Sequence, residues 1–176
     1  MAKPLANGYP IGAVMMREEV AQAMSVGKLG SLLFIPPCSN AHNSGIPGTH
    51  GTTFGGSPLA CAIGHHVLQH LSNKAFIESA KENSGYLKER LAQMTKWFPN
   101  IIQPEVRGLG FMLGIGFHDE KVPSQIVSLA RERGVLFLTA GKDAVRLVPS
   151  LNVGKEEVDF AADVLEGCLG VVESSK

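Results

Sequence analysis

Apolar residues recur every three or four positions in three long stretches of the chain, and this spacing predicts amphipathic helices. The first stretch follows Ser57 as a helix N-cap and Pro58 at the first helical position, and Pro99 ends the second stretch. Two shorter helices are also expected, one of them early in the chain. The expected helices span residues 17–24, 58–71, 74–97, 124–133 and 155–172.

Short apolar runs bounded by glycine, proline or charged residues predict strands between these helices. The most apolar run, Leu-Gly-Phe-Met-Leu-Gly-Ile-Gly-Phe, is expected to form one buried strand. The turn Ala-Gly-Lys-Asp separates two shorter runs nearer the C-terminus. The expected strands span residues 9–16, 109–117, 135–138 and 144–148. Helices that alternate with short strands predict an α/β or α+β fold.

The chain is expected to divide near residue 72, where the helix that begins at Pro58 reaches Ser72 and Asn73. Residues 1–72 contain glycine-rich and proline-rich turns of the kind found in active sites, whereas residues 73–176 resemble a compact domain of helices and a small sheet. Within the first part, residues 27–47 have no helical period and exceed the usual length of a connection. We expect them to be an atypical insert.

The composition describes an ordinary globular protein and excludes some classes of partner. The 176 residues include 16 Lys and Arg against 16 Asp and Glu, with no basic stripe, so neither nucleic acid nor an acidic membrane surface is expected as a partner. The apolar stretches are too short to span a membrane. Cys38, Cys61 and Cys168 have no metal-binding spacing, which predicts a reducing, intracellular compartment and thiols that serve as small core residues.

Lys3 is a candidate catalytic residue. It precedes the turn Asn-Gly-Tyr-Pro and a short apolar run, whereas surface lysines usually lie on solvated helix faces. Lysine forms Schiff bases with carbonyl cofactors once burial or nearby cations lower its pKa. Taken alone, however, this lysine is also compatible with an ordinary surface position.

Residues 48–56, Gly-Thr-His-Gly-Thr-Thr-Phe-Gly-Gly, form a candidate phosphate site. Glycines allow backbone N–H groups to approach an anion, threonine hydroxyls donate, and the helix that begins at Pro58 offers the positive end of its dipole. The alternative is an ordinary glycine-rich entry to a helix.

Arg146 lies in the apolar run Val-Arg-Leu-Val-Pro-Ser-Leu, where a charged residue needs a partner if it is buried. A carboxylate partner, a carboxylate substrate and a solvent-facing arginine on an edge strand are the alternatives. Arg107 gives a similar but weaker signal. His66 and His70 are one helical turn apart, but no acidic residue accompanies them, so we expect no metal site.

Four runs of residues, in the order in which they occur along the chain, closely resemble the C-terminal part of the class III pyridoxal-phosphate-dependent aminotransferases. The similarity is greatest to the acetylornithine aminotransferase branch, above all in His-Gly-Thr-Thr-Phe-Gly-Gly and Arg-Leu-Val-Pro-Ser-Leu-Asn-Val. It covers nearly the whole chain except residues 27–47. The runs begin at Lys3, Gly48, Val106 and Val145.

The resemblance implies the PLP-dependent transferase fold, fold type I, with the end of the large domain followed by the small C-terminal α+β domain. It also implies pyridoxal 5'-phosphate as cofactor and a homodimer. A eukaryotic enzyme of arginine biosynthesis would lie in the mitochondrial matrix.

The same resemblance assigns roles to four residues. Lys3 would be the Schiff-base lysine, which holds the cofactor and then moves the proton at the substrate Cα. Thr53, assisted by Thr52, would bind the cofactor phosphate of the other subunit. Arg146 would lie near the substrate carboxylate, because arginine suits a bidentate contact with that group, and it would pair with a glutamate from upstream in the family's sequence.

The implied reaction transfers the δ-amino group of N-acetylornithine to 2-oxoglutarate. Ornithine or 4-aminobutyrate aminotransferase is the alternative within the family. A catalytically silent α/β remnant or partner-binding domain is the alternative from another class.

Three departures from the family pattern accompany the resemblance. The cofactor-binding segments that the family has upstream of Lys3 are absent, so we expect this polypeptide to be inactive alone. Ser57 stands where the family usually has Asn. The third departure is the segment 27–47, where the family has only a short link, so we expect residues 28–46 to be translated intron. We also expect Met1 to be an internal methionine mistaken for a start.

Overall fold

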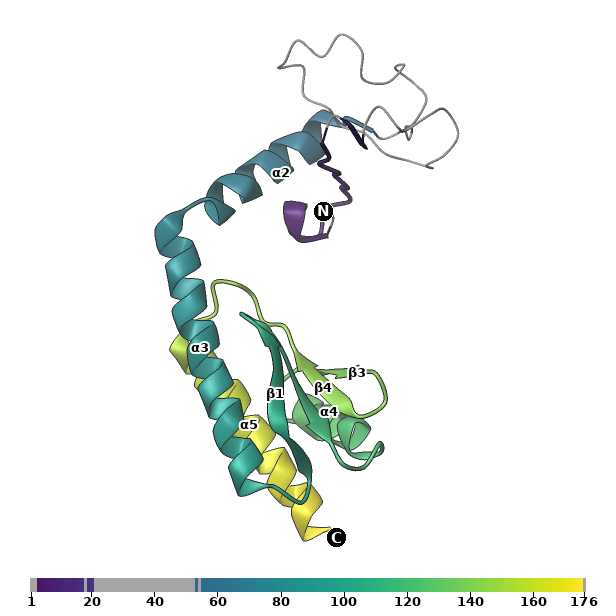
Figure 1. Cartoon of the computed structure of the whole chain (residues 1–176), viewed down its shortest axis with the longest axis vertical. Helices are drawn as coiled ribbons and strands as arrows, with labels where there is room; N and C mark the ends of the chain where they lie inside the picture. The colour runs from purple at the N-terminus through teal and green to yellow at the C-terminus, as the bar shows by residue number, and fades with distance from the viewer. Residues whose placement is uncertain (1–2, 18, 21–52, 54, 176) are drawn as a thin grey trace. The chain divides into compact units, whose positions relative to one another are not determined.

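The computed structural model describes residues 3–17, 19, 20, 53 and 55–175. The insert predicted at 27–47, most of the helix predicted at 17–24, and Thr52 lie outside the described residues. The chain divides into two compact units, residues 1–73 and 74–176 (Figure 1). We call them unit 1 and unit 2 and describe each by itself.

Unit 1 is built on a short 3₁₀ helix, η1 (Lys3–Ala6), packed against the helix α2 (Pro58–Leu71). Ala6 and Ala60 are buried, and so is Gly64, at which a Cβ would lie 3.1 Å from Cδ1 of Ile11. The residue at position 64 must therefore be small for the N-terminal segment to approach α2.

One prediction in unit 1 needs correction and another is confirmed. The strand predicted at 9–16 is not found, because residues 7–10 form turns and bends and residues 11–17 have no regular secondary structure. Ser57 is the N-cap of α2, as predicted, and proline occupies the first turn. The Ser57 hydroxyl, however, makes no capping hydrogen bond.

Unit 2 contains a four-stranded antiparallel sheet in the order β1-β2-β4-β3. The strands are β1 (Ile102–Leu109), β2 (Met112–Phe117), β3 (Leu138–Ala140) and β4 (Ala144–Leu147). The hairpin between β1 and β2 turns at Gly110 and Phe111, so the single strand predicted at 109–117 is wrong at its start. Gly108 and Gly110 have positive φ values of 114° and 55°, which glycine adopts without strain.

The strand predicted at 135–138 is also displaced. Val135 and Phe137 pack onto the core in a link after α4, Leu136 is exposed, and pairing with β4 begins at Leu138. The strand predicted at 144–148 is confirmed as β4.

Three helices cover one face of this sheet (Figure 1). They are α3 (Lys74–Trp97), α4 (Val122–Glu132) and α5 (Lys155–Ser174), and all three predicted helices are therefore confirmed within a few residues. One continuous core fills the space between helices and sheet, which stabilises unit 2 through apolar burial. Its fully buried side chains include Leu91, Met94, Ile115, Ile126, Val145, Leu165 and Leu169.

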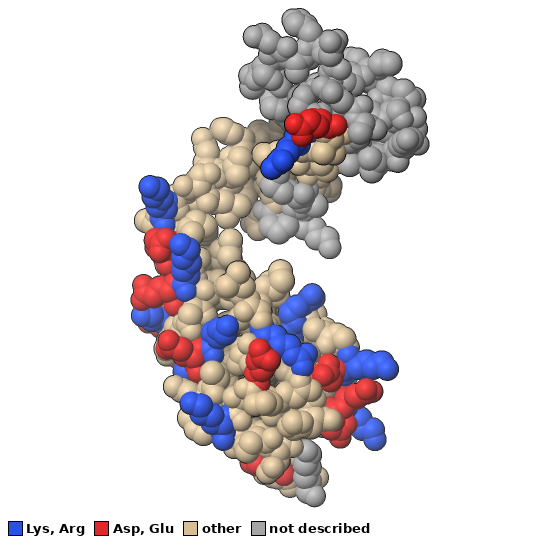
Figure 2. All heavy atoms as spheres, viewed as in Figure 1, with Lys and Arg blue, Asp and Glu red and all other residues tan. Residues whose placement is uncertain are grey.

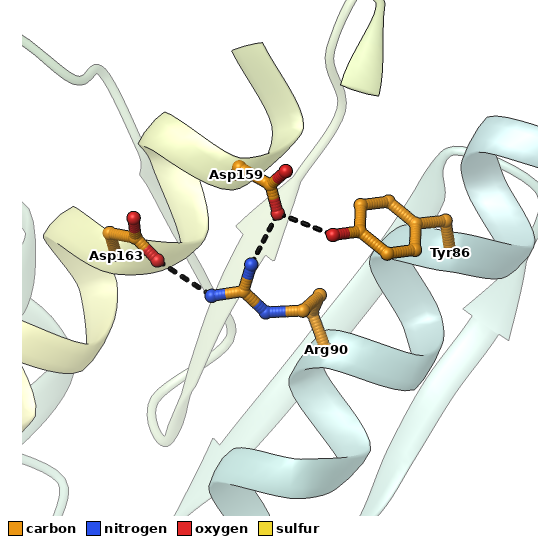
Figure 3. Close-up of polar contacts among 4 residues, drawn as sticks. All are labelled: Tyr86, Arg90, Asp159 and Asp163. Carbon is orange, nitrogen blue, oxygen red and sulfur yellow. Dashed lines mark hydrogen bonds and ion pairs between the residues drawn. The ribbon is translucent and has the colours of Figure 1, made fainter. Parts of the chain in front are cut away.

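A polar cluster also joins α3 to α5 (Figure 3). Arg90 contacts Asp159 and donates to Asp163 at 2.6 Å, and the hydroxyl of Tyr86 donates to the same Asp159 oxygen at 2.6 Å. The hydrogen bond to Asp163 is the largest cause that raises the pKa of Arg90. This arginine therefore stays charged and links both carboxylates of α5 to α3.

Among the described residues, no helix combines the length and the apolar character that crossing a bilayer requires. Blue and red side chains lie interspersed over unit 2 in the view of Figure 2, which fits the equal numbers of acidic and basic residues.

Candidate active site

Lys3 is the first residue of η1, and the position of its side chain lies outside what the structure describes. The backbone that follows Lys3 packs against α2, because the carbonyl of Leu5 and the side chain of Ile11 both approach Gly64 in the middle of that helix. The chain then turns through Asn7 and Gly8, whose φ values are 48° and 99°. The catalytic role of Lys3 stays a prediction.

Thr53 lies exposed in the turn that precedes α2. Gly56 in the same turn has a φ of 69°, and Pro58 begins the helix. A threonine hydroxyl next to a helix N-terminus has the chemistry to bind a phosphate. Thr52, its predicted companion, lies outside the described residues, so binding of a phosphate by this pair stays a prediction.

Arg146 lies in unit 2 on the face of the sheet that the helices leave uncovered. Register places Arg107 opposite Gly114 and Gly114 opposite Arg146, so these three residues share one face. We call it the open face, and it also carries Leu109, Met112 and Leu138.

The arginine prediction is partly corrected by this placement. Arg146 is exposed, and among the described residues it has no carboxylate within ion-pair distance. It does not lie on an edge strand, because β4 lies between β2 and β3. The residues on either side of it, Val145 and Leu147, are buried in the core. Arg146 is therefore an exposed cation on a rigid inner strand.

Arg107 differs from Arg146 because it has partners. Its Nη2 donates to Oε1 of Gln103 and lies 3.9 Å from Oδ2 of Asp143. Sequence reasoning did not identify Gln103 or Asp143, which are 40 residues apart in the chain. The alternating glycines 114 and 116 could have indicated this network, since glycine inside a strand often marks a close approach by another group.

The open face also exposes large apolar side chains. Leu109 is 88% exposed, Met112 66% and Leu138 57%. A cluster of exposed apolar groups around two arginines is typical of a surface that contacts a ligand or another part of a protein.

Two other features of the described residues offer few groups that could take part in catalysis. An apolar cavity of about 130 Å³ lies between α5 and residues 135–137, but its one acid, Glu157, accepts the backbone N–H of Gly154 at the start of α5. His66 and His70 are exposed, with ring centroids 4.8 Å apart, and no described group of three metal-ligating side chains includes them.

Comparison with known proteins gives a consistent family match. The family model for class III aminotransferases matches residues 1–169. A curated relative, the mitochondrial acetylornithine aminotransferase of Yarrowia lipolytica, is 40% identical over 166 residues, which cover 94% of this chain and 34% of the relative. The chain thus spans about a third of the length of the curated relatives it matches.

Solved structures show the same likeness in three dimensions. N-acetylornithine aminotransferase from Stenotrophomonas maltophilia is 30% identical with a TM-score of 0.60, and the match covers 68% of this chain and 33% of that chain. Ornithine aminotransferase from Toxoplasma gondii, described with partial occupancy of PLP at its active site, is 28% identical with a TM-score of 0.65. That match covers 74% of this chain and 31% of that one. The expected α/β fold of the PLP-dependent aminotransferases is confirmed.

Proposed function

Since the chain belongs to the class III aminotransferase family, we propose that it is part of an enzyme that transfers an amino group from N-acetylornithine to 2-oxoglutarate. The observation that carries this proposal is the family match over residues 1–169, together with relatives named acetylornithine aminotransferase. Because the chain spans about a third of those relatives, the reaction is proposed for the whole protein of which these residues are a part.

We propose pyridoxal 5'-phosphate as the cofactor, and the available donor groups suit it. Lys3 would supply the amine that attaches the cofactor, and the hydroxyls of Thr53 and Thr52 would hold its phosphate. The described position of Thr53, exposed before the first turn of α2, supports a phosphate contact of this kind. When bound, the cofactor supplies an electron sink for carbanion chemistry at the substrate.

Lys3 would also move the proton at the substrate Cα. A lysine does this only if its amine is neutral for part of the time, which requires a pKa well below that of a solvated lysine. Burial in the assembled enzyme would provide that shift. A homodimer, in which Thr53 serves the other subunit, is part of the same proposal.

Arg146 would bind a substrate carboxylate. Its exposure on the open face supports this role, because a carboxylate can reach an exposed guanidinium. Its rigid strand would hold the substrate in one orientation relative to the reacting groups.

The location proposed for the enzyme is the mitochondrial matrix, because its eukaryotic relatives carry mitochondrial names. The alternative amino donors remain ornithine and 4-aminobutyrate, and the T. gondii structure supports ornithine as the first of these.

An amino-donor comparison tests the proposal. The whole protein that contains these residues is incubated with pyridoxal phosphate, 2-oxoglutarate and N-acetylornithine, ornithine or 4-aminobutyrate, and glutamate is measured. We expect glutamate to form fastest with N-acetylornithine and not at all in Lys3→Ala. A different preferred donor would replace the proposed substrate. A folded protein that produces no glutamate from any donor would favour the catalytically silent alternative.

A further inference from the structure

Two histidines near the end of α2 share one face of the helix. His66 and His70 are four residues apart, both are exposed, and their rings meet edge to face with centroids 4.8 Å apart. Residues at this spacing have Cβ atoms about 5–6 Å apart, so two imidazole rings can turn toward one ion. Zinc metalloproteases bind their metal with two histidines at the same spacing on a helix. The pair therefore has the spacing of a bidentate metal ligand.

Hydrogen bonds at the end of α2 hold this spacing. The helix ends at Leu71, one residue after His70. The backbone N–H of Ser72 donates to the carbonyl oxygen of Leu68 at 2.9 Å, and the Ser72 hydroxyl donates to the same oxygen at 2.8 Å. The backbone N–H of Asn73 donates to the carbonyl oxygen of His70 at 3.0 Å. Because these bonds satisfy carbonyls of the last turn, His70 stays helical and the pair is formed before an ion binds.

His65 offers an alternative pair on the same helix. It is exposed and lies four residues after Cys61. The Nε2 atom of His65, however, lies 3.1 Å from Nε2 of Gln69 in a hydrogen bond. Among the described residues, no hydrogen bond of this kind engages the rings of His66 and His70. A neutral imidazole binds a metal through the nitrogen that carries its lone pair, so the second pair is the more available one.

We propose that His66 and His70 form a bidentate site for a borderline divalent transition-metal ion such as Ni²⁺, Cu²⁺ or Zn²⁺, with water in the remaining positions. Imidazole suits these ions, whereas Mg²⁺ and Ca²⁺ prefer oxygen ligands. Among the described residues, no third metal-ligating side chain accompanies the pair. The lack of an acidic neighbour argues against a zinc site with three protein ligands but not against this one, because water can complete the coordination.

This inference does not rest on the proposed function. Neither histidine belongs to the residues proposed to hold the cofactor or the substrate, and the two ligands lie on one helix. Metal binding can therefore be measured without cofactor or substrate. Its failure would leave the proposed reaction untouched, and a failure of the proposed reaction would leave the metal site untouched.

Equilibrium dialysis against Ni²⁺ provides the test. It uses the whole protein that contains these residues, first stripped of metal with EDTA. We expect His66→Gln and His70→Gln each to weaken Ni²⁺ binding by about tenfold or more, because the second ligand of a chelate acts at a high effective concentration. His65→Gln is the matched control, since it removes an exposed histidine from the same turn of α2 and should leave the affinity unchanged. An excess of Mg²⁺ should not displace the bound Ni²⁺.

The pattern across the variants decides between a chelate and separate histidines. If neither His66→Gln nor His70→Gln weakens binding, if only one of them does, or if His65→Gln weakens it as much, the inference is overturned. Circular dichroism establishes that each variant is folded. Electron paramagnetic resonance of the wild type with one equivalent of Cu²⁺ needs no variant: two nitrogen ligands are expected, and one or none would also overturn the inference.

Discussion

The two units of this chain differ in how much of their own core they contain. Unit 2 encloses a continuous apolar core between one face of its sheet and three helices. In the described part of unit 1, burial is confined to small residues such as Ala6, Ala60 and Gly64, while Val14, Met15 and Leu59 are exposed. Unit 2 thus has what a domain needs to fold by itself, whereas the described residues of unit 1 bury only small side chains and expose large apolar ones.

The largest expected difference between the units comes from core truncation. Leu91 on α3 is fully buried, and Leu91→Ala should lower the free energy of unfolding by about 3 kcal/mol. Leu68 on α2 is 49% exposed, and Leu68→Ala should cost less than about 0.5 kcal/mol. Urea unfolding followed by the fluorescence of Trp97 at the end of α3 measures Leu91→Ala, and circular dichroism, which reports the helices of both units, measures Leu68→Ala. Equal effects would contradict the claim that the core of unit 2 has no counterpart around the described residues of α2.

Backbone strain gives the next largest contrast. Gly108 has a φ of 114°, and a Cβ there would lie 1.9 Å from the backbone oxygen of Met112. Gly108→Ala should therefore cost at least about 2 kcal/mol and lower the urea midpoint.

Gly8 in unit 1 is the matched control for this substitution. It has a φ of 99°, but a Cβ added there would have no neighbour within 4 Å among the described residues, and it lies outside the unit whose unfolding Trp97 reports. Gly8→Ala should leave that transition unchanged. A shift as large as that of Gly108→Ala would mean that the units unfold together.

A smaller effect is expected from the polar cluster between α3 and α5. Replacing Arg90 with Gln leaves Asp159 and Asp163 without their cation and should cost about 1 kcal/mol. Lys88 on the same helix is exposed and has no ion pair among the described residues, so Lys88→Gln should cost less than about 0.5 kcal/mol. Thermal unfolding by circular dichroism compares the two variants, and identical unfolding midpoints would show that the cluster does not stabilise unit 2.

The smallest expected effect concerns the glycines of β2. Gly116→Ala should displace Gln103 and cost about 1 kcal/mol, roughly the net value of the hydrogen bonds lost. Gly114→Ala has room for its methyl group and should be nearly neutral in the same unfolding measurement. If Gly114→Ala were the more damaging of the two, the described network over Gly116 would be incorrect.

Sequence reasoning succeeded where local signals were strong. The helices α2, α3 and α5 have regular apolar spacing, and proline marks the start of α2 and follows the end of α3. It failed for β1, because Pro104 and the charged residues Glu105 and Arg107 hide the strand. It also merged a turn into β2, because Phe111 at that turn is buried and so extends the apolar run.

Sequence reasoning found only part of the candidate site. Lys3, Thr53 and Arg146 were found because they stand in runs that resemble a family. Arg146 could not be placed on an inner strand, since strand order depends on pairing between distant segments. The contact of Gln103 with Asp143 joins residues 40 positions apart, and no local pattern predicts it.

The most direct test of the central claim is to ask which lysine binds the cofactor. The whole protein that contains these residues is incubated with pyridoxal phosphate, treated with borohydride and digested, and pyridoxyl-modified peptides are quantified by mass spectrometry. We predict that the cofactor is fixed on Lys3 in preference to exposed lysines such as Lys88 and Lys142. Modification spread evenly over these lysines, or a Lys3 that stays unmodified, would contradict the assignment of Lys3 as the catalytic residue of an aminotransferase.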